Sequence, residues 1–487
     1  MPHEGERSGI TTGLKRLVNS ERAKILLGRT QKIVPAVMSS ASTGISVERP
    51  ATEDLPRFVI AIDGSQGLIE VEEGFPGAEM GVVTVASVMI DLHKLRQTRD
   101  NGVPNPRKFH DLYQPHGIEL FVPSTNMVTE GHSDARESYR AEFFRALGDE
   151  RLADDGESLL ETYEALLTLR SDDGANKLSC PLLGSCTEQD KGHHYHQAFG
   201  NYACVCGSKE YFSTDALRIH ESFIDAGSNP TVITESRSVL EHLVLVNYLR
   251  YFERKKMWAS LCDVAFVMDG PLSVSGHPAW LAMSIKQEIQ RLTKLSLQDG
   301  GTTPIIFGIE KTGMFQEHLM RLDRTPRPNA AAVVATTGSA PERRPDPRHL
   351  PRRGRLDPGQ VILVNDDYTK KNVIFKYEAP GAGPFKWYGQ TTQYGRKALY
   401  KTRSNALITA MPAFLHGGDD QMDTAELKQF PNLGLILSLL DALVSNAFKD
   451  ATIPLVLAHA EASIPARANE GVLKRFVREH QKETQPL

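Results

Sequence analysis

Residues 58–66 read FVIAIDGSQ, an apolar run that ends at Asp63 and is followed by a glycine. A second run of the same kind, VAFVMDGP, occupies residues 264–271 and brings Asp269 to the same position. Short apolar runs that end at a glycine predict buried strands, here with one carboxylate at each tip. Asp-Gly is also the commonest hairpin turn, so either aspartate alone is consistent with a plain turn residue. Two such strands together favour a site at one edge of a sheet.

The surrounding segments predict an α/β fold. Met80–Leu92 is rich in Val and Thr and predicts a strand that pairs with the first one through a short connection. Apolar residues recur at helical spacing over Ala135–Leu169, and a nearly all-round apolar helix is expected over Ser236–Trp258, directly before the second Asp-Gly strand. Further helices are predicted at 13–34, 213–223, 279–297, 433–448 and 461–481, strands at 304–313 and 453–459, and a β-rich region at 364–402.

The chain has 487 residues and a net charge of −4, which leaves room for two or more domains or for one large domain with insertions. No stretch approaches the apolar length that a membrane span needs, and the first residues lack the order of a signal peptide, so we expect a cytoplasmic protein without a membrane partner. The net charge gives no global sign of a polyanionic partner. The Arg-rich stretch 343–355 is either a solvated, flexible loop or an arm that follows phosphates.

Carboxylates at strand tips suit hydrolysis of a phosphodiester by two divalent ions, which needs hard oxygen ligands from several chain segments. Glu241 shares a helical stripe with apolar residues, so it should point toward protein and offer a third carboxylate. Glu235 is the rival, and an exposed helix glutamate is the alternative for either one. His459 closes the predicted strand 453–459; alone, such a histidine is more often structural, and it gains weight from the other ligands.

Four of the five cysteines cluster between residues 180 and 206, which in a cytoplasmic chain favours metal over disulfides. Four thiolates suit a closed, structural zinc site that stabilises a small knuckle. The alternative is a set of reduced, merely structural cysteines. The predicted ligands are Cys180, Cys186, Cys204 and Cys206, with His193, His194 or His196 as substitutes.

Five motifs in this order resemble the NurA nuclease family: IAIDGSQ (60–66), VMDGPL (267–272), GIEKTGMF (308–315), YGQTTQYGRKALYKT (388–402) and LAHAEASI (457–464). The resemblance spans Pro56 to Ile464. It implies an RNase H-like (PIWI-like) mixed sheet flanked by helices, manganese- or magnesium-dependent cleavage of DNA, a dimer, and a HerA-type hexameric ATPase as partner. The cysteine segment has no counterpart in compact members of the family and is predicted to be an insertion.

The resemblance also implies roles for individual residues. Asp63 and Asp269 would be metal ligands, completed by a helix glutamate, best assigned to Glu241, and by His459. Lys311, close behind a predicted strand, would position a phosphate or stabilise charge. Such an enzyme would serve DNA end processing in repair or defence against phages, and the residues do not decide between these.

The resulting domain division is an N-terminal helical segment and linker (1–55), a nuclease domain in three parts (56–174, 226–324 and 361–487), a zinc-knuckle insertion (175–225) and a flexible Arg/Pro-rich loop (325–360). Two other interpretations stay open. Asp-Gly loops also occur in actin-like ATPases and sugar kinases. A catalytically inactive scaffold that bridges DNA and an ATPase is the non-enzymatic alternative.

Overall fold

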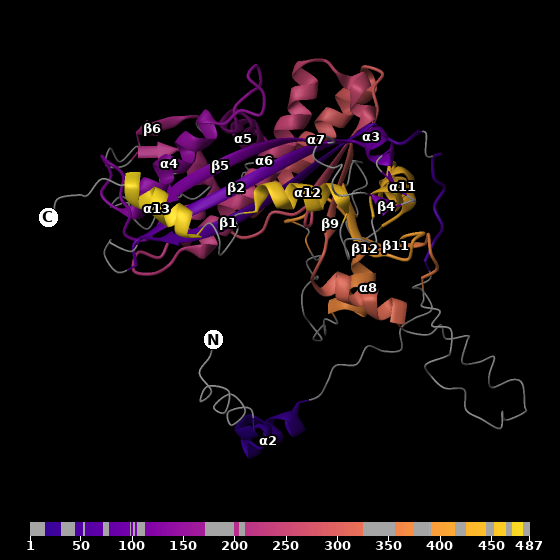
Figure 1. The fold of residues 1–487 in the computed structure, drawn as a ribbon, viewed down its shortest axis with the longest axis horizontal. Coiled ribbons are helices and arrows are strands. Elements are labelled where there is room, and N and C mark those ends of the chain that lie inside the picture. The colour runs from indigo at the N-terminus through magenta and orange to yellow at the C-terminus, as the bar shows by residue number, and fades with distance from the viewer. Residues whose placement is uncertain are drawn as a thin grey trace, which may run out of the picture.

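A mixed β-sheet forms the centre of the molecule, which is known here from a computed structural model (Figure 1). The structure describes residues 15–30, 44–51, 54–71, 77–97, 99–100, 103–104, 113–170, 199–203, 210–324, 356–374, 389, 391–413, 425–444, 452–463 and 470–480. Within these ranges, eight strands follow the spatial order β10-β11-β12-β9-β8-β1-β2-β5. Their bounds are β1 (Phe58–Glu70), β2 (Glu79–Asp91), β5 (Tyr113–Pro123), β8 (Val264–Asp269), β9 (Ile305–Glu310), β10 (Val361–Leu363), β11 (Ala398–Lys401) and β12 (Leu407–Pro412).

Three neighbouring strands at the middle of this sheet are parallel. β8 runs parallel to both β1 and β9, whereas β2 and β5 on one side and β12, β11 and β10 on the other pair antiparallel. The predicted pairing of the first two strands as a hairpin is therefore confirmed. The α/β class, with a mixed sheet flanked by helices, is confirmed as well.

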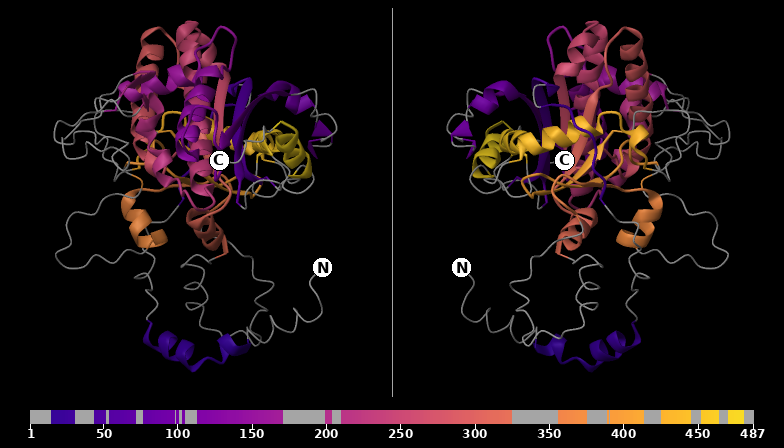
Figure 2. Two further views of the ribbon diagram at one scale, coloured as in Figure 1. Left: turned by 90° about the vertical axis from the view of Figure 1, so that its left-hand side faces the viewer. Right: turned by 90° about the vertical axis from the view of Figure 1, so that its right-hand side faces the viewer.

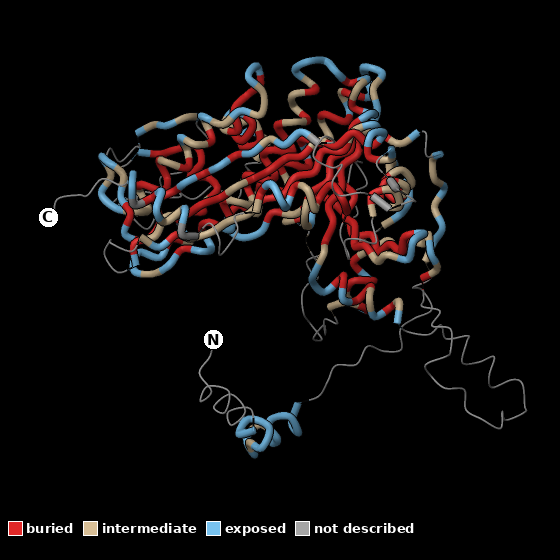
Figure 3. The backbone as a smooth tube through the Cα atoms, in the orientation of Figure 1, coloured by how far each residue is buried: buried red, intermediate tan, exposed pale blue. Residues whose placement is uncertain are grey.

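Helices cover both faces of the sheet (Figure 2). Because side chains alternate along a strand, Ile60 and Ile62 of β1 face one helical layer, while Val59 and Ala61 face the other. The first layer contains α4 (Ala135–Asp149), α5 (Leu159–Thr168), α6 (Pro230–Arg254) and α7 (Leu281–Gln298). The second layer contains α11 (Leu433–Leu443) and α12 (Ile453–Ala462). Buried backbone follows the strands between the layers (Figure 3).

A third, smaller core lies beside β10 and β11, where α8 packs through Phe315, Leu319 and Leu322. The remaining described elements are α2 (Glu21–Arg29), α3 (Leu92–Gln97), β3 (Arg99–Asp100), β4 (Val103–Pro104), β6 (Asn201–Ala203), β7 (Glu210–Phe212), η5 (Ser213–Leu217), η6 (Ile219–Ser222), η7 (Trp258–Asp263), η8 (His277–Trp280), α8 (Met314–Arg324), α10 (Asp366–Thr369), η9 (Lys370–Ile374), η10 (Leu427–Gln429) and α13 (Glu470–His480). Among the described helices, none combines the length and the apolar character required to cross a lipid bilayer.

The strand that carries Asp63 does not end there, contrary to the prediction. β1 pairs with β8 up to the pair of Ile62 with Met268, and it then continues beside β2 alone as far as Glu70. The long β1–β2 ladder keeps the chain extended through Gly64, which sequence patterns interpret as a turn. β8, in contrast, ends at Asp269 as predicted, and the following Gly270 has a φ of 107°, which favours glycine.

The predicted strand at 453–459 is wrong, because these residues form α12. A short apolar run does not distinguish a strand from a buried helix, and Pro454 is at home in the first turn of a helix. The helix predicted at 213–223 consists of two 3-10 turns. The helix predicted at 135–169 is two helices, α4 and α5, since the chain leaves helical geometry before Ser158 caps α5.

Residues 364–402 are only partly β structure. Asn365 caps a helical turn that continues as η9 to Ile374, and β11 begins at Ala398. The four predicted zinc cysteines, the three alternative histidine ligands and the Arg-rich stretch 343–355 lie outside the described residues. The zinc knuckle and the domain division therefore stay predictions.

Candidate metal centre

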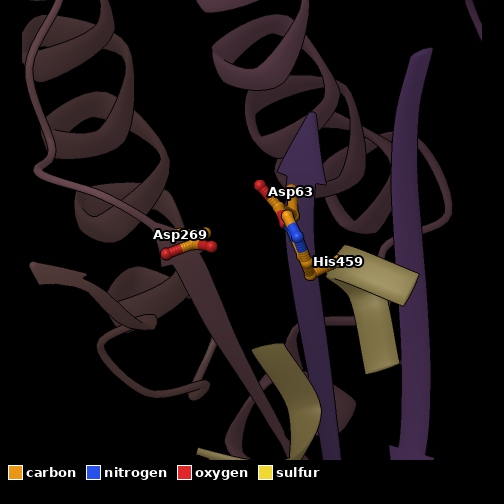
Figure 4. Close-up of side chains that lie close together, drawn as sticks. All are labelled: Asp63, Asp269 and His459. Atoms are coloured by element: carbon orange, nitrogen blue, oxygen red, sulfur yellow. The ribbon is translucent and has the colours of Figure 1, made fainter. Parts of the chain in front are cut away.

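Three predicted ligands from distant parts of the chain meet at one point (Figure 4). Asp63, Asp269 and His459 each offer one ligand atom, and these atoms all lie within 4.8 Å of one another. The Nδ1 atom of His459 lies 2.8 Å from Oδ2 of Asp63. Among the described residues, this is the group of acidic, histidine or cysteine side chains that could hold a metal ion.

The sheet explains why the two aspartates converge. Ile62 of β1 lies opposite Met268 of β8, so the next residue on each parallel strand is an aspartate at the same level. Both aspartates continue the alternation of residues that face α11 and α12. His459 reaches them from the last turn of α12, which packs on that face against β1 and β2. The structure brings His459 next to the two aspartates, although the helix that carries it was predicted as a strand.

The electrostatics of the centre favour a bound cation. Asp63 is 4% exposed, and burial, followed by the neighbouring charge of Asp269, raises the pKa of its carboxyl although His459 partly offsets the effect. Two carboxylates held together out of water repel each other, and a divalent cation relieves both the repulsion and the desolvation. Two carboxylate oxygens and one imidazole nitrogen form a mixed donor set that suits Mn²⁺ and related divalent ions.

Lys311 compensates part of this charge in the structure. Its Nζ lies 2.5 Å from Oδ2 of Asp269, and it follows directly after the end of β9, the strand beside β8. An ammonium group at this distance forms a charge-assisted hydrogen bond with the carboxylate. The structure thus places the predicted lysine at the centre.

Glu241 lies next to the centre but on the other side of β1. It belongs to α6, on the face of the sheet to which Gly64 points, and a Cβ atom on Gly64 would come within 2.5 Å of its Oε1. Gly64 therefore leaves room for the glutamate side chain. Burial, with smaller contributions from Asp63 and Asp269, raises the pKa of Glu241 to about 7 despite an ion pair at 3.0 Å with Arg237. Glu241 is not part of the three-residue group.

Glu235, the rival ligand, points elsewhere. Its Oε1 accepts a hydrogen bond of 3.1 Å from the backbone N–H of His277, and it packs closely under Gly276. Glu235 and Glu241 are six positions apart on α6, so only the latter reaches the centre of β1.

A cavity of about 790 Å³ opens beside the three ligands. Arg237, Glu310 and Lys397 also line it, although the sequence analysis did not single them out. Glu310 is the last residue of β9 and immediately precedes Lys311. Its position at the end of a predicted strand could have identified it as a candidate site residue. The other lining residues are Asp63, Gly64, Asp269, Gly270, Pro271, Ser273, Lys311, Thr312, Gly313, Met314, Phe315, Gln393 and His459.

Comparisons with known proteins add no family to these observations. No protein-family model matches the chain, and no curated protein matches it at a significant level. What the fold and the site define is thus an α/β protein in which a buried aspartate, a half-buried aspartate and an exposed histidine lie together at the side of an open cavity. Any particular function has to be argued from this geometry.

Proposed function

We propose that this protein is a divalent-metal-dependent DNA nuclease of the NurA type that hydrolyses phosphodiester bonds. The observation that carries the proposal is the convergence of Asp63, Asp269 and His459, with Lys311 against the second aspartate, at the side of a cavity. Asp63 and His459 are 396 positions apart in the sequence, and their side chains lie 2.8 Å apart. Perturbed, like-charged carboxylates in a cleft are typical of functional sites.

The strand order supports an RNase H-like core within the sheet. The order β5-β2-β1-β8-β9 combines three antiparallel strands with two further strands parallel to β1. This is the arrangement expected of the RNase H-like fold. In chain order, the first and fourth strands of this set are β1 and β8, which carry Asp63 and Asp269. This agrees with the roles that the resemblance implies.

Each side chain has a task that its position allows. Asp63, Asp269 and His459 would hold Mn²⁺ or Mg²⁺, whose contribution is to lower the pKa of a bound water and to neutralise charge on the phosphate. Lys311, when a cation takes over Asp269, has its ammonium group free to meet a phosphate oxygen in the cavity. Three ligands suffice for one ion, and a second ion of the two-metal mechanism remains part of the proposal.

The biological setting is proposed on the resemblance alone. It comprises a dimer, a HerA-type hexameric ATPase that delivers DNA, a structural zinc ion on the four cysteines, and a role in DNA end processing or phage defence. Cytoplasmic location belongs to the same set of proposals.

Cleavage of linear DNA by the purified protein in Mn²⁺ tests the proposal. We expect Asp63→Asn and Asp269→Asn each to lower cleavage at least about a hundredfold, because each removes a ligand charge where phosphate charge must be stabilised. The matched control is Asp91→Asn, which changes another aspartate at a strand end, hydrogen-bonded to Arg57 outside the cavity. Equal cleavage by all four folded proteins would show that a contaminating nuclease is responsible and would refute the proposal.

A further inference from the structure

We propose that Lys397 is a second phosphate-binding residue of this cavity, which holds a backbone phosphate next to the one being cleaved. The inference rests on the proposed function and specifies the substrate further, as a strand with at least two successive phosphates in the cavity. It is argued from a buried ion pair that lies apart from the three metal-binding side chains.

The pair consists of Lys397, directly before β11, and Glu310, at the end of β9. The Nζ of Lys397 is hydrogen-bonded to Oε1 of Glu310 and lies 4.5 Å from the centroid of the Phe315 ring. Both charged residues are almost fully buried, at 6% and 9% exposure, yet both line the cavity together with Phe315. A charged group with little access to bulk water but with access to a cavity is well placed to meet a ligand.

Because side chains alternate between the two faces of a strand, the Lys397–Glu310 pair lies on the opposite face of the sheet from the metal centre. Asp269 of β8 pairs with Ile309 of β9, so the two point to the same face and the next residue, Glu310, points to the opposite one. Glu310 in turn pairs with Thr409, whose hydroxyl donates a hydrogen bond to Gln316 of α8. The cavity is therefore lined from both faces of the sheet at the end of the parallel strands, by the aspartates on one face and by Glu310 with Lys397 on the other. An elongated, repeatedly charged ligand matches this arrangement.

The energetics give the ion pair little value as a purely structural feature. Burial lowers the pKa of the Lys397 ammonium to about 7, which shows how strongly the surroundings disfavour its charge. Buried ion pairs are often replaced by apolar residues without loss of stability. Lys397 lies where a phosphate oxygen in the cavity can provide the counter-charge that Glu310 now provides.

Lysine at position 401 provides a matched control. Lys401 is the last residue of β11, is 9% exposed, and forms a 2.6 Å ion pair with Asp323, but it does not line the cavity. Lys397→Met and Lys401→Met thus remove the same charge from similar surroundings, one inside the cavity and one outside it.

The experiment has two parts, both in Mn²⁺. Steady-state cleavage of a short DNA oligonucleotide compares each lysine variant with the wild type. Equilibrium binding of the same oligonucleotide compares Asp63→Asn protein with and without each lysine substitution. We expect Lys397→Met to raise KM on the order of tenfold with little change in kcat, the loss expected for one charge-assisted hydrogen bond. The slope of log Kd against log salt should fall by about 1, since one phosphate contact is lost. Lys397→Arg should keep the salt slope of the parent. Lys401→Met should change neither KM nor slope.

The inference is overturned if folded Lys397→Met and Lys401→Met have the same KM and the same salt slope as their parents while the wild type cleaves DNA. A wild type that binds the oligonucleotide without cleaving it contradicts the proposed function, and the salt slopes then still decide the role of Lys397. A wild type that neither binds nor cleaves overturns both. Should Lys397→Met fail to fold, Glu310→Gln replaces it: loss of the competing carboxylate is expected to lower KM, and an unchanged KM counts against the inference.

Discussion

Two buried carboxylates of this protein differ in how their charge is satisfied. Glu288 of α7 accepts hydrogen bonds from Arg250 at 2.6 Å and from Arg291 at 2.7 Å. Burial alone would raise the pKa of its carboxyl, but the two arginines more than compensate and the pKa is lowered. Asp63 is buried to a similar degree, and its hydrogen-bond partners are the backbone N–H of Gly64 and the imidazole of His459. Burial and the neighbouring Asp269 raise the pKa of its carboxyl. The charge of the first carboxylate is compensated by side chains of the protein, whereas the second lies beside another carboxylate, as expected for the cation site proposed above.

Glu288→Gln should cause the largest change in stability. It leaves two arginines of a buried network without their shared counter-charge, and we expect the free energy of unfolding to fall by about 3 kcal/mol. Urea unfolding at neutral pH measures this. Cleavage per folded molecule should not change, since Glu288 lies outside the cavity; a loss of cleavage would remove the distinction between the two carboxylates.

Mn²⁺ should stabilise the wild type and should not stabilise Asp269→Asn. At a concentration one hundred times the dissociation constant, a ligand that binds only the folded state adds about 2.7 kcal/mol. Because the raised pKa of Asp63 makes protons compete with the ion, this stabilisation should weaken as the pH falls. Thermal unfolding with and without chelator, at pH 6 and pH 8, tests both statements. Equal stabilisation of the variant would place the ion elsewhere.

Glu241→Gln should change how the free energy of unfolding depends on pH. The pKa of Glu241 is raised to about 7, so between the unfolded-state pKa and pH 7 the folded state holds a proton that the unfolded state releases. In chelator, the wild type should therefore lose about 3 kcal/mol of stability as the pH rises through this window, and the glutamine variant should not. Parallel stability curves for the two proteins from pH 5 to pH 8.5 would show that Glu241 is ionised throughout.

Asp63→Asn should have the smallest effect on stability, within about 1 kcal/mol in chelator. The sign follows from the raised pKa of Asp63: the folded state loses stability as the pH rises through this pKa and the buried carboxyl ionises. Asparagine does not ionise, and its amide still offers a hydrogen-bond partner to His459. Unfolding at pH 8 in chelator should therefore show the variant equal to or more stable than the wild type. A marked destabilisation would mean that Asp63 is a structural residue like Glu288.

The aspartates were predictable from the sequence because each depends on local information. A strand of apolar residues and its polar end are visible in a short window, and β8 indeed ends at Asp269. The continuation of β1 past Asp63 was not predictable, since it depends on thirteen paired positions with β2 rather than on the local Asp-Gly pattern. His459 was identified for its place in a motif although its helix was taken for a strand.

Residues that reach the site through tertiary packing were harder to predict. The helical stripe of Glu241 correctly indicated a buried glutamate, but it did not reveal on which face of β1 the helix packs. Lys397 meets Glu310 across 87 positions of sequence, through the antiparallel strands β11 and β12, and no local pattern marks that contact.

The division of β1 between two partners has a mechanical consequence. Asp63 is carried by the ladder that β1 forms with β2, and Asp269 by the ladder that β8 forms with β9; the two ladders are joined only up to the level of Ile62 and Met268. Any change in the twist of one ladder against the other alters the separation of the carboxylates directly. For the ion site proposed above, the twist of the sheet would therefore set the distance between the two aspartate ligands and, with it, the affinity for the ion.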